Sequence, residues 1–130
     1  MKKKYFVYVI LASSIVAACT IRFWWVTTPC ERYFYRNRDQ LTQYSELLIS
    51  NHDKLKEPFP LPDWLLKSDI SDLDLHKDYV DFYYYRYYTF PDGPMDHLVY
   101  SKSGVLPSGI RKPVFKVTKL SSNWYYVETD

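Results

Sequence analysis

A long uncharged segment near the N-terminus restricts this chain more than any other feature of its sequence. Lys2 to Lys4 are followed by 17 residues without a formal charge, Tyr5 to Ile21, and then by Arg22 and two tryptophans. An α-helix rises 1.5 Å per residue, so about 20 apolar residues cross the ~30 Å hydrocarbon core of a bilayer. The sequence therefore predicts that residues 5–26 form one transmembrane helix in contact with membrane lipid, with its tryptophans in the interfacial layer.

The same segment also fits a lipid anchor. Val16-Ala17-Ala18-Cys19 resembles the cleavage box of bacterial lipoprotein signal peptides, in which the cysteine becomes the lipidated N-terminus. The residues that follow, Thr20 to Val26, are apolar and aromatic, whereas lipoprotein tethers are usually polar and flexible. Both alternatives stay open at this point, with Cys19 as the candidate lipidation site, and each of them holds the chain at a membrane.

The flanking charges are nearly balanced, because three lysines precede the segment and four arginines follow it between residues 22 and 38. A short basic start before an apolar run is typical of secretory signals, which places the folded part outside the cytoplasm. We therefore predict a single-pass protein of a bacterial inner membrane that faces the periplasm. Lipid anchoring at Cys19 and a cytoplasmic orientation are the alternatives.

The rest of the chain has the composition of one small globular domain. Of the 130 residues 47% are hydrophobic, and 14 tyrosines, 7 phenylalanines and 4 tryptophans can fill a core. This predicts a signal or transmembrane anchor over 1–27 and a single small α+β extracytoplasmic domain over 28–130. From residue 28 onward 15 acidic residues outnumber 13 basic ones, so the net charge of +2 gives no indication of a nucleic-acid partner.

A helix-start signal follows the apolar segment. Thr28 is a suitable N-cap, Pro29 a suitable first residue, and Glu31 completes a capping box. Apolar residues then recur at helical spacing, at Phe34, Leu41, Tyr44 and Leu48. We predict an amphipathic helix over 29–50, with Asn51 as a left-handed terminator.

After residue 70 the hydrophobic periodicity changes from helical spacing to alternation. The predicted strands span residues 70–76, 79–90, 96–101, 113–120 and 123–128. Short turns rich in Gly, Pro, Ser and Asn separate them, which is typical of an antiparallel meander. The predicted fold class is α+β: an N-terminal membrane helix, then one amphipathic helix packed on an antiparallel β-meander of about four to five strands.

Two stretches of the chain resemble small bacterial membrane-attached proteins of unknown function. They are Val99-Tyr-Ser-Lys-Ser-Gly-Val-Leu-Pro107 and Leu120-Ser-Ser-Asn-Trp-Tyr-Tyr126. Proteins of that kind pair a hydrophobic N-terminus and a helix with a sheet that ends in a Trp-Tyr strand. The resemblance implies a fold rather than an activity, and some of the similar proteins occur near toxin–immunity pairs.

The longest predicted strand carries the candidate binding residues. Tyr83, Tyr85 and Tyr87 alternate on one of its faces, where they would form a flat platform suited to contact with a protein or a sugar. The alternative is that the helix over 29–50 packs on this face. This alternative is favoured, because a small domain needs to bury one aromatic stripe in order to fold. Arg86, on the opposite face, then requires a carboxylate partner or the sheet edge.

Other constellations give no sign of catalysis. Acidic and histidine side chains gather at Asp69, Asp72, Asp74, His76, Asp78 and Asp81. The calcium-loop pattern is missing and same-face neighbours on a strand lie ~6.6–7 Å apart, so we expect a solvated strand face and no metal site. The three histidines are scattered and no Gly-x-Ser-x-Gly turn occurs. We predict no catalytic residues and no cofactor.

These features predict a membrane-tethered, non-enzymatic interaction protein of the bacterial cell envelope, and another protein as its partner. Immunity toward a membrane-proximal or periplasmic toxin is the most specific version of this hypothesis. The alternative is a cell-envelope glycan-binding domain that uses the tyrosines. A tyrosine-lined site of ~300 Å³ or more would favour the glycan binder, and an accessible array of histidine, carboxylate and nucleophile would favour a hydrolase.

Overall fold

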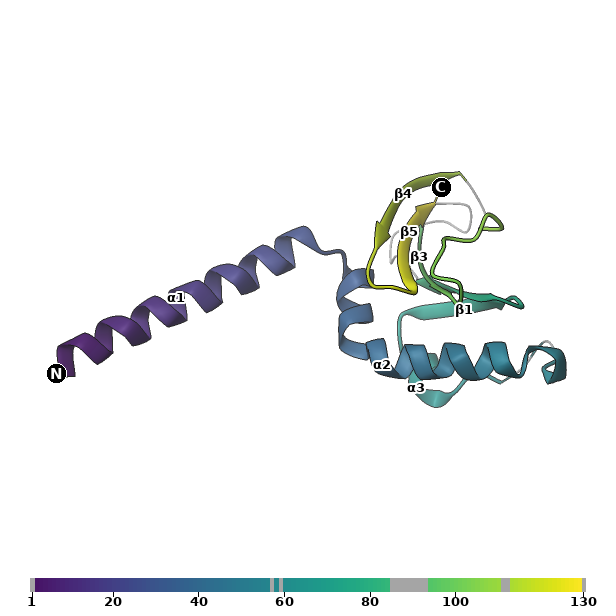
Figure 1. Ribbon diagram of the computed structural model, residues 1–130, viewed down its shortest axis with the longest axis horizontal. Helices are drawn as coiled ribbons and strands as arrows, with labels where there is room; N and C mark the ends of the chain where they lie inside the picture. The colour runs from purple at the N-terminus through teal and green to yellow at the C-terminus, as the bar shows by residue number, and fades with distance from the viewer. Residues whose placement is uncertain (1, 57, 59, 85–93, 111–112, 130) are drawn as a thin grey trace.

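A long N-terminal helix leads away from a five-stranded sheet that a second helix covers (Figure 1). The computed structural model describes residues 2–56, 58, 60–84, 94–110 and 113–129. Its helices are α1 (Lys2–Val26), α2 (Pro29–Ser50), the 3-10 turn η1 (His52–Lys54) and α3 (Asp63–Leu66). Its strands are β1 (Ile70–Leu75), β2 (Tyr79–Tyr84), β3 (Met95–Ser101), β4 (Val114–Lys119) and β5 (Trp124–Thr129). The predicted α+β class is confirmed.

Local capping fixes where α2 begins. The Glu31 backbone N–H donates to Thr28 Oγ1 (3.2 Å), and the Thr28 N–H donates to Glu31 Oε2 (2.6 Å), which completes the predicted capping box. The helix spans the predicted residues, because this cap satisfies the donors that a helix N-terminus leaves open.

The helix ends at Ser50 as predicted, but the conformation that terminates it differs from the prediction. Asn51 has a φ of −107°, so it is not a left-handed terminator. Its backbone N–H (3.2 Å) and its side-chain Nδ2 (2.8 Å) both donate to the Leu47 carbonyl. These two hydrogen bonds to the Leu47 carbonyl close the last turn. The chain then continues directly into η1 without a positive φ at Asn51.

The sheet is antiparallel throughout and has the strand order β1-β2-β3-β5-β4. It is meander-like, except that β5 lies beside β3 while β4 forms the edge. The chain from β3 to β4 passes over one face of the sheet, where Leu106 and Ile110 pack on Val99, Tyr125 and Val127. This packing carries the chain past the position that β5 later fills. Residues 85–90 of the predicted strand over 79–90 lie outside the described residues.

The main core lies between α2 and the opposite face of the sheet. The buried stripe of α2 contacts alternate residues of β2, β3 and β5. The largest fully buried side chains of this core are Trp124, Tyr126, Phe34 and Phe82. Trp124 is central: its ring centroid lies 5.2 Å from that of Phe34 and 5.2 Å from that of Tyr100.

The favoured expectation that α2 packs on the Tyr83 face is therefore wrong. The helix covers the face that carries Val80, Phe82 and Tyr84. On that face the paired residues Phe82, Leu98 and Tyr126 form a continuous apolar row across three strands. On the other face the corresponding row contains Tyr83 and His97, which are polar. Burying the apolar row removes more apolar surface from water.

We call the part of the chain from residue 28 onward the head. We expect the replacement of Phe34 by alanine to destabilise the head strongly, because Phe34 is 0% exposed in the core. The free energy of unfolding of the full chain in detergent, measured with urea, should fall by about 3–5 kcal/mol. Phe115→Ala is the matched control, since Phe115 is 65% exposed on β4 and its loss should change stability by no more than about 0.5 kcal/mol. Equal losses in the two variants would contradict the placement of the core.

Candidate functional site

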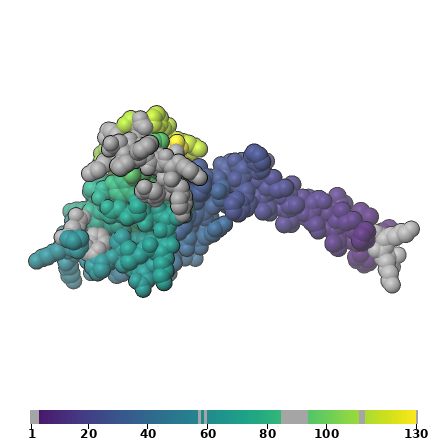
Figure 2. Space-filling model, turned by 180° about the vertical axis from the view of Figure 1, so that it is seen from behind, coloured from purple at the N-terminus to yellow at the C-terminus, as the bar shows by residue number. Residues whose placement is uncertain are grey.

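The surface of α1 is apolar and uncovered. Residues Lys4–Val26 have a mean hydropathy of 2.0 with 0% of the apolar window buried, and the helix projects free of the head (Figure 2). Such a helix is long and apolar enough to cross a membrane, although a signal sequence has the same properties. The hydroxyls of Ser13, Ser14 and Thr20 each donate to a carbonyl one turn earlier, at 2.8 Å, so the span leaves them satisfied. Cys19 is exposed within the same uninterrupted helix.

Two arginines of α2 reach back to the end of α1. The Cζ of Arg32 lies 4.5 Å from the centroid of the Trp24 ring, and the Cζ of Arg36 lies 5.7 Å from it. Arg32 Nη1 also donates to the Trp24 carbonyl (3.2 Å) and to the Thr27 carbonyl. We call Trp24, Arg32 and Arg36 the junction cluster. The carbonyls that Arg32 bonds are among those that the end of a helix leaves without partners.

The predicted tyrosine platform is described only at one of its residues. The hydroxyl of Tyr83 donates to Asp74, and its ring centroid lies 4.8 Å from that of His97. Tyr83 is half-buried on the face away from α2. Tyr85 and Tyr87 lie outside the described residues, as does Arg86.

A buried polar array links three strands on this face. His97 Nδ1 lies 2.9 Å from Asp81 Oδ1, and His97 Nε2 lies 2.9 Å from Thr129 Oγ1. The order carboxylate, imidazole, hydroxyl is that of a hydrolase triad. However, Thr129 is only 4% exposed, and a substrate carbonyl would have to come within ~3 Å of its oxygen. The array therefore acts in this structure as a cross-strand link.

The acidic run is divided between two environments. Asp72, His76 and Asp78 are exposed, as expected of a solvated strand face. Asp81 is buried and bonded to His97, so its placement on that solvated face was wrong. The reason lies in the sheet, since β2 is flanked by β1 and β3, whereas β1, which carries Asp72, forms an edge. The described residues bring together no group of three metal-ligating side chains.

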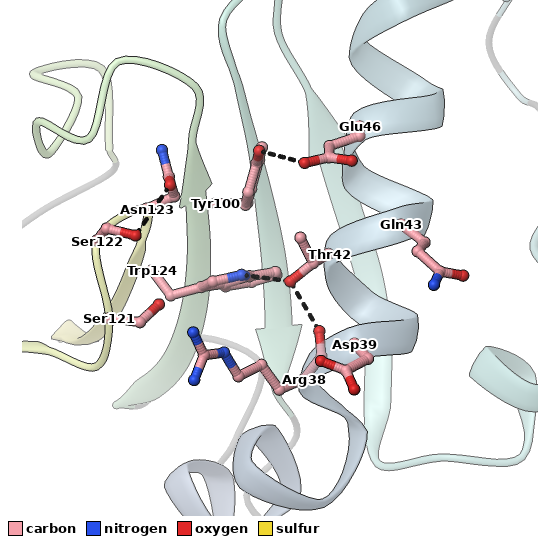
Figure 3. Close-up of a pocket in the computed structure, with 10 residues that line it drawn as sticks. All are labelled: Arg38, Asp39, Thr42, Gln43, Glu46, Tyr100, Ser121, Ser122, Asn123 and Trp124. Carbon is pink, nitrogen blue, oxygen red and sulfur yellow. Dashed lines mark hydrogen bonds between the residues drawn. The ribbon is translucent and has the colours of Figure 1, made fainter.

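A polar groove of about 360 Å³ lies between α2 and the turn before β5 (Figure 3). Its α2 wall carries Arg38, Asp39 and Glu46, and the turn over 121–123 forms the opposite wall. The groove's floor is Trp124, whose Nε1 donates to Thr42 Oγ1 (2.9 Å). Because Trp124 is 1% exposed, the groove offers an indole edge and no open ring for stacking on a sugar.

The edge strand β4 exposes apolar side chains. Val114 is 42%, Phe115 65% and Val117 43% exposed. Only β5 pairs with β4 among the described strands, so its other side forms the edge of the sheet. Residues 110–122 contain four basic residues and no acidic one. The sequence predicted this strand but not its position at the edge, which depends on the exchange of β4 and β5.

No protein-family model matches the chain. Comparisons with curated proteins and with solved structures also found no match.

Among the ionisable groups of the described residues, Tyr126 has the most strongly perturbed pKa. Burial raises the pKa of its hydroxyl far above the ordinary value, and the nearby carboxylates of Asp96 and Glu128 raise this pKa further. The hydroxyl donates to Asp96 Oδ1 (2.9 Å) and lies 3.2 Å from Glu128 Oε2. The folded state therefore keeps this proton at a pH where the unfolded chain loses it.

We expect the free energy of unfolding to fall as the pH rises above about 10, the ordinary pKa of tyrosine. Above that pH the folded state binds more protons at Tyr126 than the unfolded state does, so stability decreases by about 1.4 kcal/mol per pH unit from this group. Tyr126→Phe should make the slope shallower by that amount, although it lowers stability at pH 7 by removing the bond to Asp96. Urea unfolding of the full chain at pH 7 to 11 measures both effects. An unchanged slope would show that Tyr126 ionises normally in the fold.

Proposed function

We propose that this chain is a membrane-anchored, non-enzymatic interaction protein, with uncleaved α1 as its single membrane span and the head outside the cytoplasm. The exposed apolar surface of α1 is the observation that carries this proposal. The cores of the head include no residue before Cys30, so the head does not use α1 to complete its packing. A helix that is apolar all round and contacts the head only at its last turn is stable in lipid rather than in water.

The spanning helix is preferred to the lipid anchor for a structural reason. Cleavage before Cys19 would interrupt a continuous helix and leave Cys19 to Val26 as its remainder. That remainder carries Trp25, which is 86% exposed, and Trp24, which the arginines of α2 contact. Both tryptophans fit the interfacial end of a full span better than a flexible tether.

For the interaction role we propose the β4 edge as the contact surface, and an extended acidic segment of another envelope protein as its occupant. The free edge of β4 offers backbone groups for pairing with an added strand. Val117 and Phe115 offer apolar contacts beside this edge, and Lys116 and Lys119 supply a positive charge. Exposed lysines also oppose pairing of β4 with a second copy of itself, which favours an acidic partner.

The glycan alternative has less support from the described residues. The groove beside α2 is large enough for a small ligand, but Tyr100 is its single tyrosine, and its floor presents an indole edge. The non-enzymatic character draws on the burial of Thr129 in the array with Asp81 and His97.

Membrane insertion is tested in bacterial cells that express the full chain. We expect the chain to stay with the membrane pellet after extraction with alkaline carbonate, and its intact mass to include residues 1–18 without an acyl group. Lys102→Cys places a thiol at an exposed site, so a membrane-impermeant maleimide should label it from outside. The wild type, whose Cys30 is buried, is the control. A diacylated or triacylated Cys19, or labelling only after lysis, would contradict the span or its orientation.

The contact surface is tested by photo-crosslinking in the same membranes. A photoreactive residue in place of Phe115 should give one discrete adduct with another protein, whereas one in place of Leu66 should not. Both residues are large, apolar and more than half exposed, but Leu66 lies on α3. We expect Lys116→Glu with Lys119→Glu to reduce the adduct at least about fivefold, because two charges are reversed. An adduct of twice the chain mass, or equal adducts at both sites, would refute the assignment.

A further inference from the structure

Two guanidinium groups lie against the Trp24 ring at the end of α1, and neither has an acidic partner within the described part of the chain. Arg32 and Arg36 are stacked on Trp24, and neither forms an ion pair with a carboxylate among the described residues. Arg32 uses Nη1 for the two carbonyls of the helix end, and Arg36 makes no hydrogen bond to any described residue. Arginine carries five N–H donors, so most donors of this pair remain available for a ligand.

The position of the junction cluster relative to the bilayer follows from the length of α1. From Tyr5 to Trp24 the helix rises by about 28 Å, close to the ~30 Å of the hydrocarbon core. Trp24 is then at the interface, where tryptophan rings are enriched at the level of the lipid headgroups. Since both guanidinium groups lie against the Trp24 ring, they are held at the same depth.

The distribution of charge along the chain supports an anionic ligand at this level. Residues 22–38 contain four arginines and one acidic residue, Glu31, which is buried in the capping box of α2. Residues 39–130 contain ten basic and 14 acidic residues. The positive charge of this region therefore gathers at the end of the head that adjoins the bilayer, and the remainder of the head is negative.

We propose that Arg32 and Arg36 bind the phosphate of an anionic phospholipid, with its acyl chains lying along the end of α1. This inference rests on the proposed membrane span. Planar guanidinium groups bind phosphate oxygens through paired, charge-assisted hydrogen bonds. Trp24 holds the two groups in place, and its stacking lowers the entropy that a flexible pair of side chains would lose on binding. The bound lipid fixes the head against the membrane surface.

A carboxylate of a second membrane protein is the other group that pairs with arginines. Phosphatidylglycerol binding that does not depend on Arg36 would overturn the lipid site and favour this carboxylate. The lipid is favoured because the ligand has to reach the interfacial depth of Trp24, where headgroup phosphates are abundant. Basic clusters immediately beside a membrane span typically bind anionic headgroups.

The test measures binding of phosphatidylglycerol to the detergent-solubilised full chain by native mass spectrometry, with phosphatidylcholine as the neutral lipid. We expect phosphatidylglycerol to bind the wild type more tightly. Arg36→Gln should weaken this binding about fivefold, and Arg32→Gln with Arg36→Gln about 25-fold, whereas phosphatidylcholine binding should not change. Arg38→Gln is the matched control, because Arg38 is an exposed arginine of the same helix that does not contact Trp24 and should lose less than about twofold.

Arg36→Gln is the decisive variant because Arg32 also supports the end of α1, and circular dichroism verifies the helix content of each variant. The proposal is overturned if Arg36→Gln binds phosphatidylglycerol as the wild type does, or if Arg38→Gln loses as much. It is also overturned if inorganic phosphate at the same concentration displaces the lipid, which would indicate a free-anion site. Carbonate extraction distinguishes failure of the lipid site from failure of the membrane span. If the chain stays in the membrane but Arg36→Gln binds phosphatidylglycerol as the wild type does, only the lipid site is refuted.

Discussion

The packing of Trp124 in the core of the head is the interaction on which the rest of the structure depends. Its indole ring lies against Phe34 of α2 and against Tyr100 of β3, and its Nε1 is bonded to Thr42. Its contacts with Phe34 and Thr42, about two helical turns apart, position α2 on the sheet. Because α2 begins at Pro29, directly after α1 ends at Val26, its arginines reach Trp24.

The two faces of the sheet have different chemistry. One face is apolar and covered by α2, while the other contains the linked Asp81, His97 and Thr129. Hydrogen bonds inside the sheet satisfy these polar groups, so their burial stabilises the pairing of three strands. The side chains that are available to contact a ligand or a partner therefore lie at the periphery: at the junction cluster, in the groove beside α2 and along β4. A binding role makes direct use of such surfaces.

Much of this fold was predictable from local patterns. The bounds of α2 follow from its capping box and helical spacing, and the strands follow from alternation interrupted by turn residues. The end of α2 was predicted wrongly at Asn51, because an asparagine can close a helix either through a left-handed backbone or through its side chain. The environment of Asp81 was also predicted wrongly, since alternation assigns a residue to a face but does not say whether that face is covered.

The sequence by itself determined the apolar N-terminal helix, the capped helix, the strands and the excess of arginine after the apolar helix, since each depends on residues close together in the chain. The tertiary structure decided which face α2 covers, that β5 lies between β3 and β4, and that Arg36 meets Trp24. These outcomes depend on contacts between distant segments, and the segments compete for the same apolar surfaces. The balance of buried area that selects among them exists only once all the elements are present together.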